Sequence, residues 1–343
     1  MVERGPDRGW TTSAMLAATP MGIIDLIRER ARRAAPLLLT PVLAGCLPAS
    51  ATVEGEQVSR LYDPLRHRSH AFRYGLDPGV VGLSYAAQAL WFLGYPDQAL
   101  EQNAEALTLA HELAHPHTVA HALGFAALFH QFRRETHAVN EQVEALMALS
   151  REQEFAQWLA WGTMLRGWVL VRQGLGAEGV MHMRQGLHAF DDIGAALGRP
   201  YWLALLAEAC GKVGQVEEGL RMLAAAQDAI QATGEHRWAA EIYRLRGELM
   251  QALPQAHENE AEVCFQQAIE VARRQQAKSL ELRATMSLCR LRQRRCKHEG
   301  TRQQLSEIYG LFTEGFHTAD MQEAKALLAD PRREGPRKPR DVL

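Results

Sequence analysis

From Leu61 onward the pattern of apolar and polar residues is regular and helical, and the alternation typical of β-strands is nearly absent. Gly and Pro interrupt this pattern at intervals, as in Gly94-Tyr95-Pro96 and Gly174-Leu175-Gly176. Because Pro favours the first turn of a helix and Gly the residue after the last turn, these breaks separate consecutive helices. The predicted helices cover residues 77–93, 96–113, 118–132, 136–151, 155–173, 177–193, 199–213, 216–233, 236–253 and 258–276, and two or three more lie between 278 and 330.

A pair of small residues seven positions apart recurs about every 40 residues along these helices. Another small residue precedes each pair, as at Ala87 and Gly167. Small side chains let two helix backbones approach closely, and a repeat of this length is typical of stacked helix pairs. We therefore expect an all-α, right-handed superhelix of five or six antiparallel helix pairs over residues 54–330, capped by Tyr309 to Leu328, with an extended surface for a partner. The pairs of small residues are Ala99 with Ala106, Ala138 with Ala145, Gly179 with Gly186, Gly219 with Ala226, and Ala261 with Ala268.

Composition narrows the possible partners. The chain has 343 residues, of which 47% are apolar, and its net charge of −2 argues against nucleic acid or an anionic membrane as the partner. The five cysteines include no CxxC pair, so we expect neither a disulfide framework nor a zinc site. The apolar runs are shorter than the roughly 18 residues that a transmembrane helix requires. These features favour a cytoplasmic protein.

The two ends of the chain do not carry the repeat. Residues 1–53 read as an irregular leader, either signal-like or mispredicted, in which Leu43-Ala44-Gly45-Cys46 resembles the lipobox of bacterial lipoproteins. The alternative to a cytoplasmic protein is therefore a lipoprotein anchored at Cys46. Residues 331–343 combine several prolines with basic side chains, and we expect them to be a disordered tail.

The helix-pair spacing resembles the tetratricopeptide repeat, although the step here is near 40 residues rather than 34. Several strings also resemble the carboxy-terminal array of large bacterial proteins that join a class III adenylate or guanylate cyclase domain to a signalling-type ATPase. They include Leu61-Tyr62-Asp63-Pro64, Arg166-Gly167-Trp168, the stretch from Ala272 to Arg283, and Phe312-Thr313-Glu314-Gly315-Phe316.

This resemblance implies a non-catalytic module that mediates protein–protein interaction within a signalling system and needs no cofactor. Its partner would be a protein, such as a separately encoded cyclase or ATPase. The chain itself has no P-loop, because Gly211-Lys212 lies inside a helical pattern and is followed by Val213. A first alternative is the sensor array of a transcriptional regulator, which would bind a small ligand.

A second alternative, an enzyme, comes from the HExxH sequence His111-Glu112-Leu113-Ala114-His115, with His121 as a possible third zinc ligand. Zinc proteases of this type carry both histidines one turn apart on a helix. Here Pro116 ends the helix directly after the second histidine, and Thr118 replaces the glycine of the longer motif. We therefore favour a chance match and predict no metal site.

Tryptophan and arginine residues on the first helices of the pairs are the candidates for a binding groove. Large aromatic residues at helical spacing more often fill the space between repeats, and we favour that interpretation for these tryptophans. The basic run from Arg290 to Lys297 is interpreted as a solvated helix end rather than a nucleic-acid patch. The groove candidates are Trp161, Arg166, Trp168, Arg199, Trp202 and Trp238.

Overall fold

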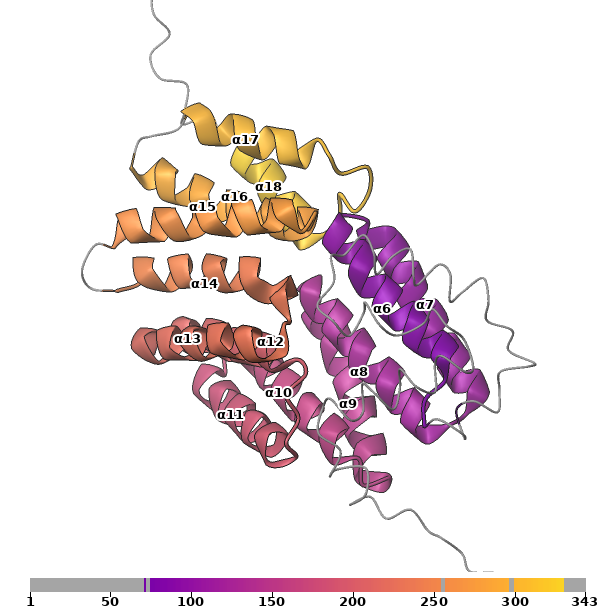
Figure 1. The fold of residues 1–343 in the computed structure, drawn as a ribbon. Coiled ribbons are helices and arrows are strands. Elements are labelled where there is room, and N and C mark those ends of the chain that lie inside the picture. Colours follow the sequence, from indigo (N-terminus) through magenta and orange to yellow (C-terminus); the bar gives the residue numbers. More distant parts are fainter. Residues whose placement is uncertain (1–70, 72–74, 254–256, 296–298, 330–343) are drawn as a thin grey trace, which may run out of the picture.

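The computed structural model describes residues 71, 75–253, 257–295 and 299–329, and these residues form helices and no strands (Figure 1). The leader, Cys46, the first part of the expected array and the basic tail lie outside the described residues. Consecutive helices pack against each other in pairs, as expected for a helical repeat solenoid. The pairs are α6 (Pro78–Leu93) with α7 (Pro96–Leu113), α8 (Pro116–Phe132) with α9 (Thr136–Glu152), α10 (Ala156–Arg172) with α11 (Gly176–Asp192), α12 (Arg199–Lys212) with α13 (Val216–Thr233), α14 (Ala239–Gln251) with α15 (Glu258–Arg274), and α16 (Lys278–Arg294) with α17 (Glu299–Tyr309).

Two boundaries differ from the sequence prediction. The helix expected at 236–253 begins as a short 3₁₀ turn, His236–Trp238, before α14 starts at Ala239. The expected cap at 309–328 is a loop followed by α18 (Ala319–Ala329), because α17 ends at Tyr309. The all-α fold and its division into helix pairs are confirmed.

The small residues allow the closest contacts between paired helices. A Cβ atom added to Gly167 on α10 would lie 2.5 Å from the carbonyl oxygen of Gly179 on α11, and one added to Gly179 would lie 2.5 Å from that of Gly167. A Cβ on Gly186 would lie 2.9 Å from the carbonyl oxygen of Ala160. The backbones of α10 and α11 therefore touch where the sequence pattern predicts it.

The small residues of three other pairs occupy the same two places on their helices as Gly179 and Gly186 do on α11. These places are the fourth and eleventh residues of the second helix, and all six residues there are buried. Gly219 faces the first helix of its own pair, because a Cβ there would lie 3.0 Å from the carbonyl oxygen of Ala207 on α12. The three pairs are Ala99 with Ala106 on α7, Gly219 with Ala226 on α13, and Ala261 with Ala268 on α15.

The prediction that Ala138 and Ala145 are the buried small pair of α9 is wrong. Ala138 is only partly buried and Ala145 is exposed. The fourth and eleventh residues of α9 are Val139 and Leu146, and both are fully buried. The close contacts in this region are made by glycines of the neighbouring first helices. A Cβ on Gly124 of α8 would lie 2.7 Å from the ring of Trp158, and one on Gly162 of α10 would lie 2.6 Å from Cγ of Met147 on α9.

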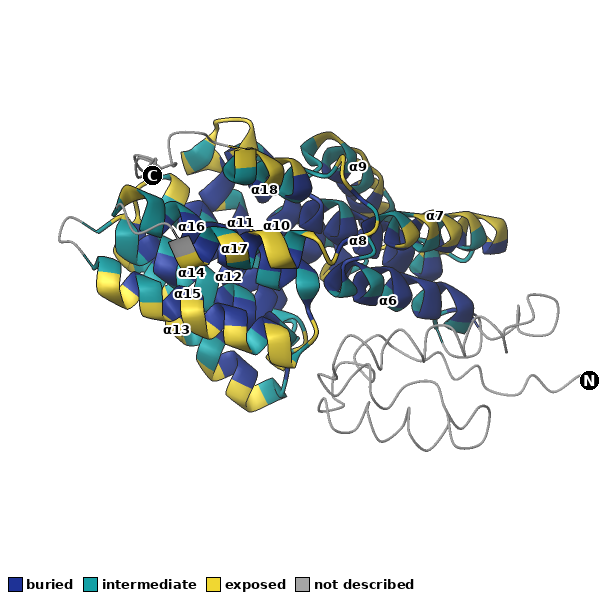
Figure 2. Ribbon diagram, turned by 90° about the horizontal axis from the view of Figure 1, so that it is seen from above, coloured by how far each residue is buried: buried dark blue, intermediate teal, exposed yellow. Residues whose placement is uncertain are grey.

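The two helices of a pair have different surroundings (Figure 2). The first helices, such as α8 and α12, bury residues around most of their circumference, whereas the second helices, such as α7 and α13, bury one stripe and expose the rest. The first helices therefore form the inner layer of the superhelix. None of the described helices is long and apolar enough to cross a membrane.

The superhelix closes on itself, which the sequence prediction of an extended surface did not anticipate. Helix α16 contacts α6, and the Ser279 hydroxyl donates a 2.5 Å hydrogen bond to the carbonyl oxygen of Trp91 (Figure 1). The Glu314 carboxylate, in the loop before α18, accepts hydrogen bonds of 2.8 and 3.1 Å from the backbone N–H groups of Asp97 and Gln98 at the start of α7. The last repeat thus rests on the first.

We predict that Gly167→Ala destabilises the protein by about 1–3 kcal/mol, because the new methyl group would overlap backbone atoms of α11 that cannot move independently. Alanine's higher helix propensity would offset only part of this loss. Urea-induced unfolding followed by circular dichroism measures the difference.

Gly300→Ala on α17 is the matched control, since a Cβ there meets no atom within 4 Å. We expect this variant to be as stable as the unmodified chain or slightly more stable. Equal stability of the two variants would contradict a tight contact between α10 and α11.

Candidate ligand site in the central cavity

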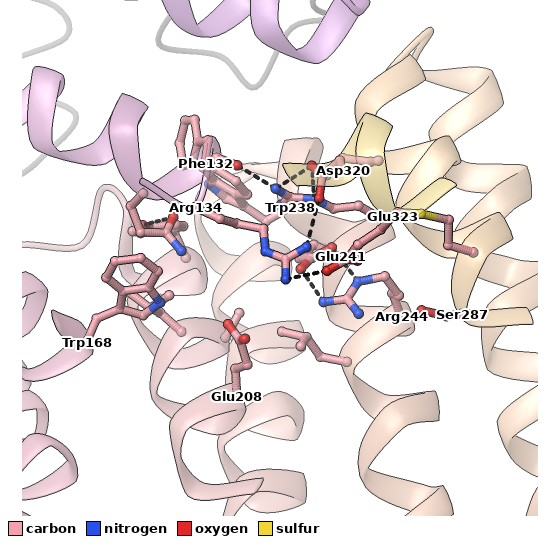
Figure 3. Close-up of a pocket in the computed structure, with 18 of the residues that line it drawn as sticks. Phe132, Arg134, Trp168, Glu208, Trp238, Glu241, Arg244, Ser287, Asp320 and Glu323 are labelled. Atoms are coloured by element: carbon pink, nitrogen blue, oxygen red, sulfur yellow. Dashed lines mark hydrogen bonds and ion pairs between the residues drawn. The ribbon is translucent and has the colours of Figure 1, made fainter. Parts of the chain in front are cut away.

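The inner helices line a partly open cavity of about 300 Å³ (Figure 3). Each of the six repeats contributes to its wall through its first helix or the adjoining turn, and α18 contributes the remaining side. The cavity therefore exists only because the array curves until its ends meet. Its lining residues are Trp91, Gln131, Phe132, Arg134, Trp168, Arg172, Tyr201, Ala204, Leu205, Glu208, Lys212, Trp238, Glu241, Arg244, Leu245, Leu280, Arg283, Met286, Ser287, Arg290, Asp320 and Glu323.

Aromatic rings from four repeats form one wall. The ring centroid of Phe132 lies 5.1 Å from that of Trp91 and 5.4 Å from that of Trp238, and Tyr201 lies 4.7 Å from Trp238. The Tyr201 hydroxyl donates a 2.8 Å hydrogen bond to Oε1 of Gln131, and burial raises the pKa of Tyr201 well above its ordinary value. This wall is rigid, since every ring packs against another ring.

Charged side chains line the rest of the cavity, and basic groups outnumber acidic ones by six to four. Because the surplus is positive, the cavity favours negatively charged ligands over cations. The basic residues are Arg134, Arg172, Lys212, Arg244, Arg283 and Arg290, and the acidic residues are Glu208, Glu241, Asp320 and Glu323.

Two carboxylates of α18 join the second repeat to the sixth, and we call these two residues, Asp320 and Glu323, the clasp. Arg134, in the turn after α8, lies 3.2 Å from Oδ1 of Asp320 and 2.9 Å from Oε1 of Glu323. On α16, Arg283 lies 2.7 Å from Oδ2 of Asp320, and Arg290 lies 2.8 Å from Oε2 of Glu323. Each carboxylate therefore bridges two arginines.

The ion pairs of the clasp shift the pKa values of Glu323 and Arg134. Burial alone would raise the pKa of Glu323, but the hydrogen bonds and charges of Arg134 and Arg290 outweigh it and lower the pKa below its ordinary value. Burial likewise disfavours the charged form of Arg134, yet its hydrogen bond to Glu323 and the charges of both carboxylates raise its pKa. Glu323 and Arg134 are therefore both charged at neutral pH.

A second ion cluster lies deeper in the wall. The Arg244 guanidinium donates hydrogen bonds of 2.7 and 2.9 Å to the carboxylate of Glu241, and Lys212 lies 2.7 Å from Glu208. Burial opposes ionisation of both glutamates, but these cations lower the pKa of each below its ordinary value. Each of these pairs lies within one helix, Glu208 with Lys212 on α12 and Glu241 with Arg244 on α14, so they fix the orientation of the charged side chains that line the cavity.

The candidate groove residues do not form one site. Trp168 and Trp238 line the cavity, whereas Trp161 and Trp202 are buried between repeats with their ring centroids 5.1 Å apart. The two candidate arginines do not line the cavity. Arg166 lies 2.9 Å from Glu144, and Arg199 lies 2.9 Å from Asp191.

The small residues of the repeat pattern lie outside the cavity wall. They are on the second helices, which form the outer layer, and the wall is built from the first helices, their turns and α18. Ala106, Ala226 and Ala268 are each buried, and none of them lines the cavity. These residues therefore set the spacing of the helices and are not part of the candidate site.

The HExxH residues lie on two helices. Helix α7 ends at Leu113, and Ala114 takes a left-handed conformation with φ of 52°, so His115 begins the next helix and caps α8. His121 is buried with its ring stacked 4.2 Å from Phe125, and burial lowers its pKa to about 3. The structure therefore separates the residues that a zinc protease would hold on one helical face. Within the described ranges, no group of three or more His, Cys, Asp and Glu side chains is arranged to hold a metal ion.

The expectation of a solvated basic helix end is wrong for most of the run that starts at Arg290. Arg292 and Arg295 lie 2.7 and 2.9 Å from the carboxylate of Glu262 on α15, and Arg290 is bound to the clasp. These arginines join α16 to its neighbours. Their acidic partners are about 30 residues away in the chain, so the local pattern gave no sign of them.

Sequence reasoning also missed Arg134, Arg283 and the clasp as site residues. Asp320 and Glu323 lie in the stretch from Tyr309 to Leu328, which was expected only to cap the array, so neither was considered as a site residue. Arg134 has a φ of 66°, which is uncommon for a residue other than glycine, but the sequence around it contains no motif that predicts this conformation. These residues become a site only through contacts between distant repeats.

Comparison with known proteins gives a partial match and no family. No family model matches the chain. An uncharacterized protein of Rhizobium meliloti (strain 1021) is 28% identical over 231 residues, which is 66% of this chain and 22% of that protein. The chain thus spans about a fifth of the length of this curated relative, where the similar segment is part of a much longer protein.

We predict that the ion pairs of Glu323 contribute stability above pH 4.5, the ordinary pKa of a glutamate, and that this contribution is lost as the pH falls below it. The sign follows from the lowered pKa of Glu323, because the unfolded chain then takes up its proton at a higher pH than the folded one. Glu323→Gln should lower stability by about 1 kcal/mol or less at pH 7, given its partial exposure, and should have little effect at pH 3.

Thermal unfolding of both proteins across this pH range measures the effect. Glu105→Gln, at an exposed position of α7, is the control for losing one negative charge. A Glu323→Gln difference that is as large at pH 3 as at pH 7 would show that the ion pairs are not responsible.

Proposed function

We propose that this chain is a non-catalytic regulatory module that binds a small molecule in its central cavity and reports this binding to a signalling partner. The observation that carries the proposal is the partly open cavity of about 300 Å³ to which all six repeats contribute lining residues. A cavity of this size is at the lower end of the range that small-molecule sites occupy.

The closed shape supports a small ligand over a peptide. In an open array, an extended peptide lies along the inner face of successive first helices. Here the aromatic wall covers part of that face, and the contact between α6 and α16 closes the path that a long peptide would follow. A compact molecule that fits within the cavity meets no such obstacle.

The bonding of the cavity's ionisable groups supports a role in binding. Glu208 and Glu241 are engaged by Lys212 and Arg244, and the clasp carboxylates by three arginines. Carboxylates held this way stay ionised and bonded, whereas a general acid or base must exchange protons with a substrate. Such groups suit recognition.

The convergence of all six repeats on one cavity supports a regulatory role. Because every repeat contributes to the wall, a ligand in the cavity would contact side chains from the whole array at once. Ligand contacts that join distant repeats change the relative stability of closed and open arrangements, which is how binding alters the equilibrium between two states. The outer helices would carry that change to the partner.

The partner in this proposal is a protein of the cyclase–ATPase type, either separately encoded or joined to the array in a longer chain. The strings that resemble such proteins support it. The relative, in which the similar segment makes up 22% of the sequence, supports an array that is joined to further sequence in a longer chain. The partner would receive the signal, and the ligand in the cavity would start it.

We predict that a panel of metabolites contains a ligand that raises the melting temperature, because a ligand that binds only the folded state stabilises it. At about 100 times its Kd such a ligand contributes about 2.7 kcal/mol, or roughly 5–10 °C for an array of this size. Ala204→Phe, which adds a ring to a buried residue of the cavity wall, should abolish the effect. Differential scanning fluorimetry measures both.

Ala224→Phe, at an exposed position of α13, is the matched control and should respond as the unmodified chain does. Circular dichroism checks that both variants are folded. Stabilisation that persists in Ala204→Phe would show that the ligand binds elsewhere, and a panel without any stabilising compound would contradict the sensor.

A further inference from the structure

Three arginines converge at the side of the cavity that the clasp closes (Figure 3). Arg134 comes from the turn between α8 and α9, while Arg283 and Arg290 lie two turns apart on α16. Between them they donate four hydrogen bonds to Asp320 and Glu323, with N–O distances of 2.8–3.2 Å. The clasp carboxylates thus occupy an anion site built by another part of the chain.

One of the three arginines is held in place by contacts that do not involve the clasp. The Arg283 guanidinium lies over the ring of Trp91, 4.9 Å from its centroid, and also donates a hydrogen bond to the carbonyl oxygen of Phe132. The backbone N–H of Arg134 donates to the carbonyl oxygen of Gln131 at 2.9 Å, which fixes the turn that carries this side chain. Because the contacts of Arg283 do not depend on the carboxylates, its guanidinium is preorganised for an anion.

The clasp is attached differently. Asp320 and Glu323 lie on the last described helix, whose buried residues Met321 and Ala324 belong to a small hydrophobic cluster separate from the main core. Both carboxylates are on short or flexible side chains that can rotate away while this cluster stays packed. The carboxylates are therefore the partners that another anion could replace, and Arg283 is the anchored guanidinium of the site.

Charge and geometry define which ligands can replace the clasp carboxylates. Three guanidiniums face two carboxylates, so the site keeps a positive charge even when the clasp is engaged. A guanidinium presents parallel N–H donors that fit the paired oxygens of a carboxylate or a phosphate. An anion with two negative charges would restore the balance that the clasp now provides, and the aromatic wall adjoins the space beside it.

We propose that the ligand of the cavity is a small organic dianion, of the phosphate monoester or dicarboxylate class, which binds Arg134, Arg283 and Arg290 in place of the clasp carboxylates. This inference rests on the proposed function, since it names the chemistry of the molecule that the cavity senses. Exchange of the clasp for the ligand would release α18 from the second repeat, and so would convert binding into a change at the junction of the first and last repeats.

Isothermal titration calorimetry on the full chain tests the inference at constant ionic strength. Phenyl phosphate is the phosphate probe and succinate the dicarboxylate probe, while benzylamine serves as the cationic comparison. We expect at least one dianion to bind and benzylamine not to bind. The stronger of the two dianions identifies which of the two classes the site prefers.

Two variants should change the affinity in opposite directions. Arg283→Gln removes hydrogen bonds to the anion and should weaken binding about 10-fold or more. Asp320→Asn combined with Glu323→Gln removes the competing charges and should strengthen binding about 10-fold. Should the double variant fold poorly, Glu323→Gln alone should strengthen binding by a smaller factor. Arg221→Gln, whose partner is Glu218 on the outer helix α13, is the matched control and should leave the affinity unchanged.

The inference is overturned if neither dianion binds, if benzylamine binds as tightly as the dianions, if the clasp variants bind no more tightly than the unmodified chain, or if Arg221→Gln weakens binding as much as Arg283→Gln does. Failure of the inference can be told apart from failure of the proposed function. A neutral or cationic metabolite whose stabilising effect is lost in Ala204→Phe would leave the sensor intact and exclude the dianion. A panel with no stabilising compound would remove both.

Discussion

The contact between the first and last repeats determines the shape of everything inside the array. Ser279 and Glu314 bind backbone groups of the first helix pair, and the arginines of α16 reach across to the second. Without these contacts the inner helices would still stack, since each pair packs on its neighbours, but their inner face would be an open groove. Closure turns that groove into a cavity and brings side chains from all six repeats to one place.

The forces that produce closure are of two kinds. The aromatic residues Trp91, Phe132 and Trp238 bury large apolar surfaces against each other, and this packing is favourable whatever the pH. The ion pairs between arginines and the clasp add little net stability, because partly exposed charges are screened by water. Their role is to set the geometry, and the weak net stability of ion pairs makes them suited to exchange with another anion. The structure thus separates a permanent hydrophobic contact from an exchangeable polar one.

Much of the fold could be predicted from the sequence because its causes are local. Gly94 and Pro96 mark a turn whichever partner the helices have, and the spacing of small residues reports the close approach of paired helices. The error at Ala138 and Ala145 has a physical explanation. Close packing needs a small residue on one of two facing helices. Around α9 that residue is Gly162 of α10, which meets Met147, while the fourth and eleventh positions of α9 carry Val139 and Leu146. The search for two small residues seven apart therefore selected two alanines that were one position out of register.

The site was much less predictable than the fold. Of the six groove candidates only Trp168 and Trp238 line the cavity, and the arginines that matter most to it, Arg134 and Arg283, were not among them. By itself the sequence determined that this protein is a stack of helix pairs with boundaries at particular glycines and prolines, because helix formation depends on neighbours within a few residues. Only the tertiary structure decided that the stack closes, because the residues that close it are far apart in the sequence. Trp91 and Ser279 are separated by 188 positions, and Asp97 and Glu314 by 217. No local pattern encodes such a pairing, and the cavity exists only as its consequence.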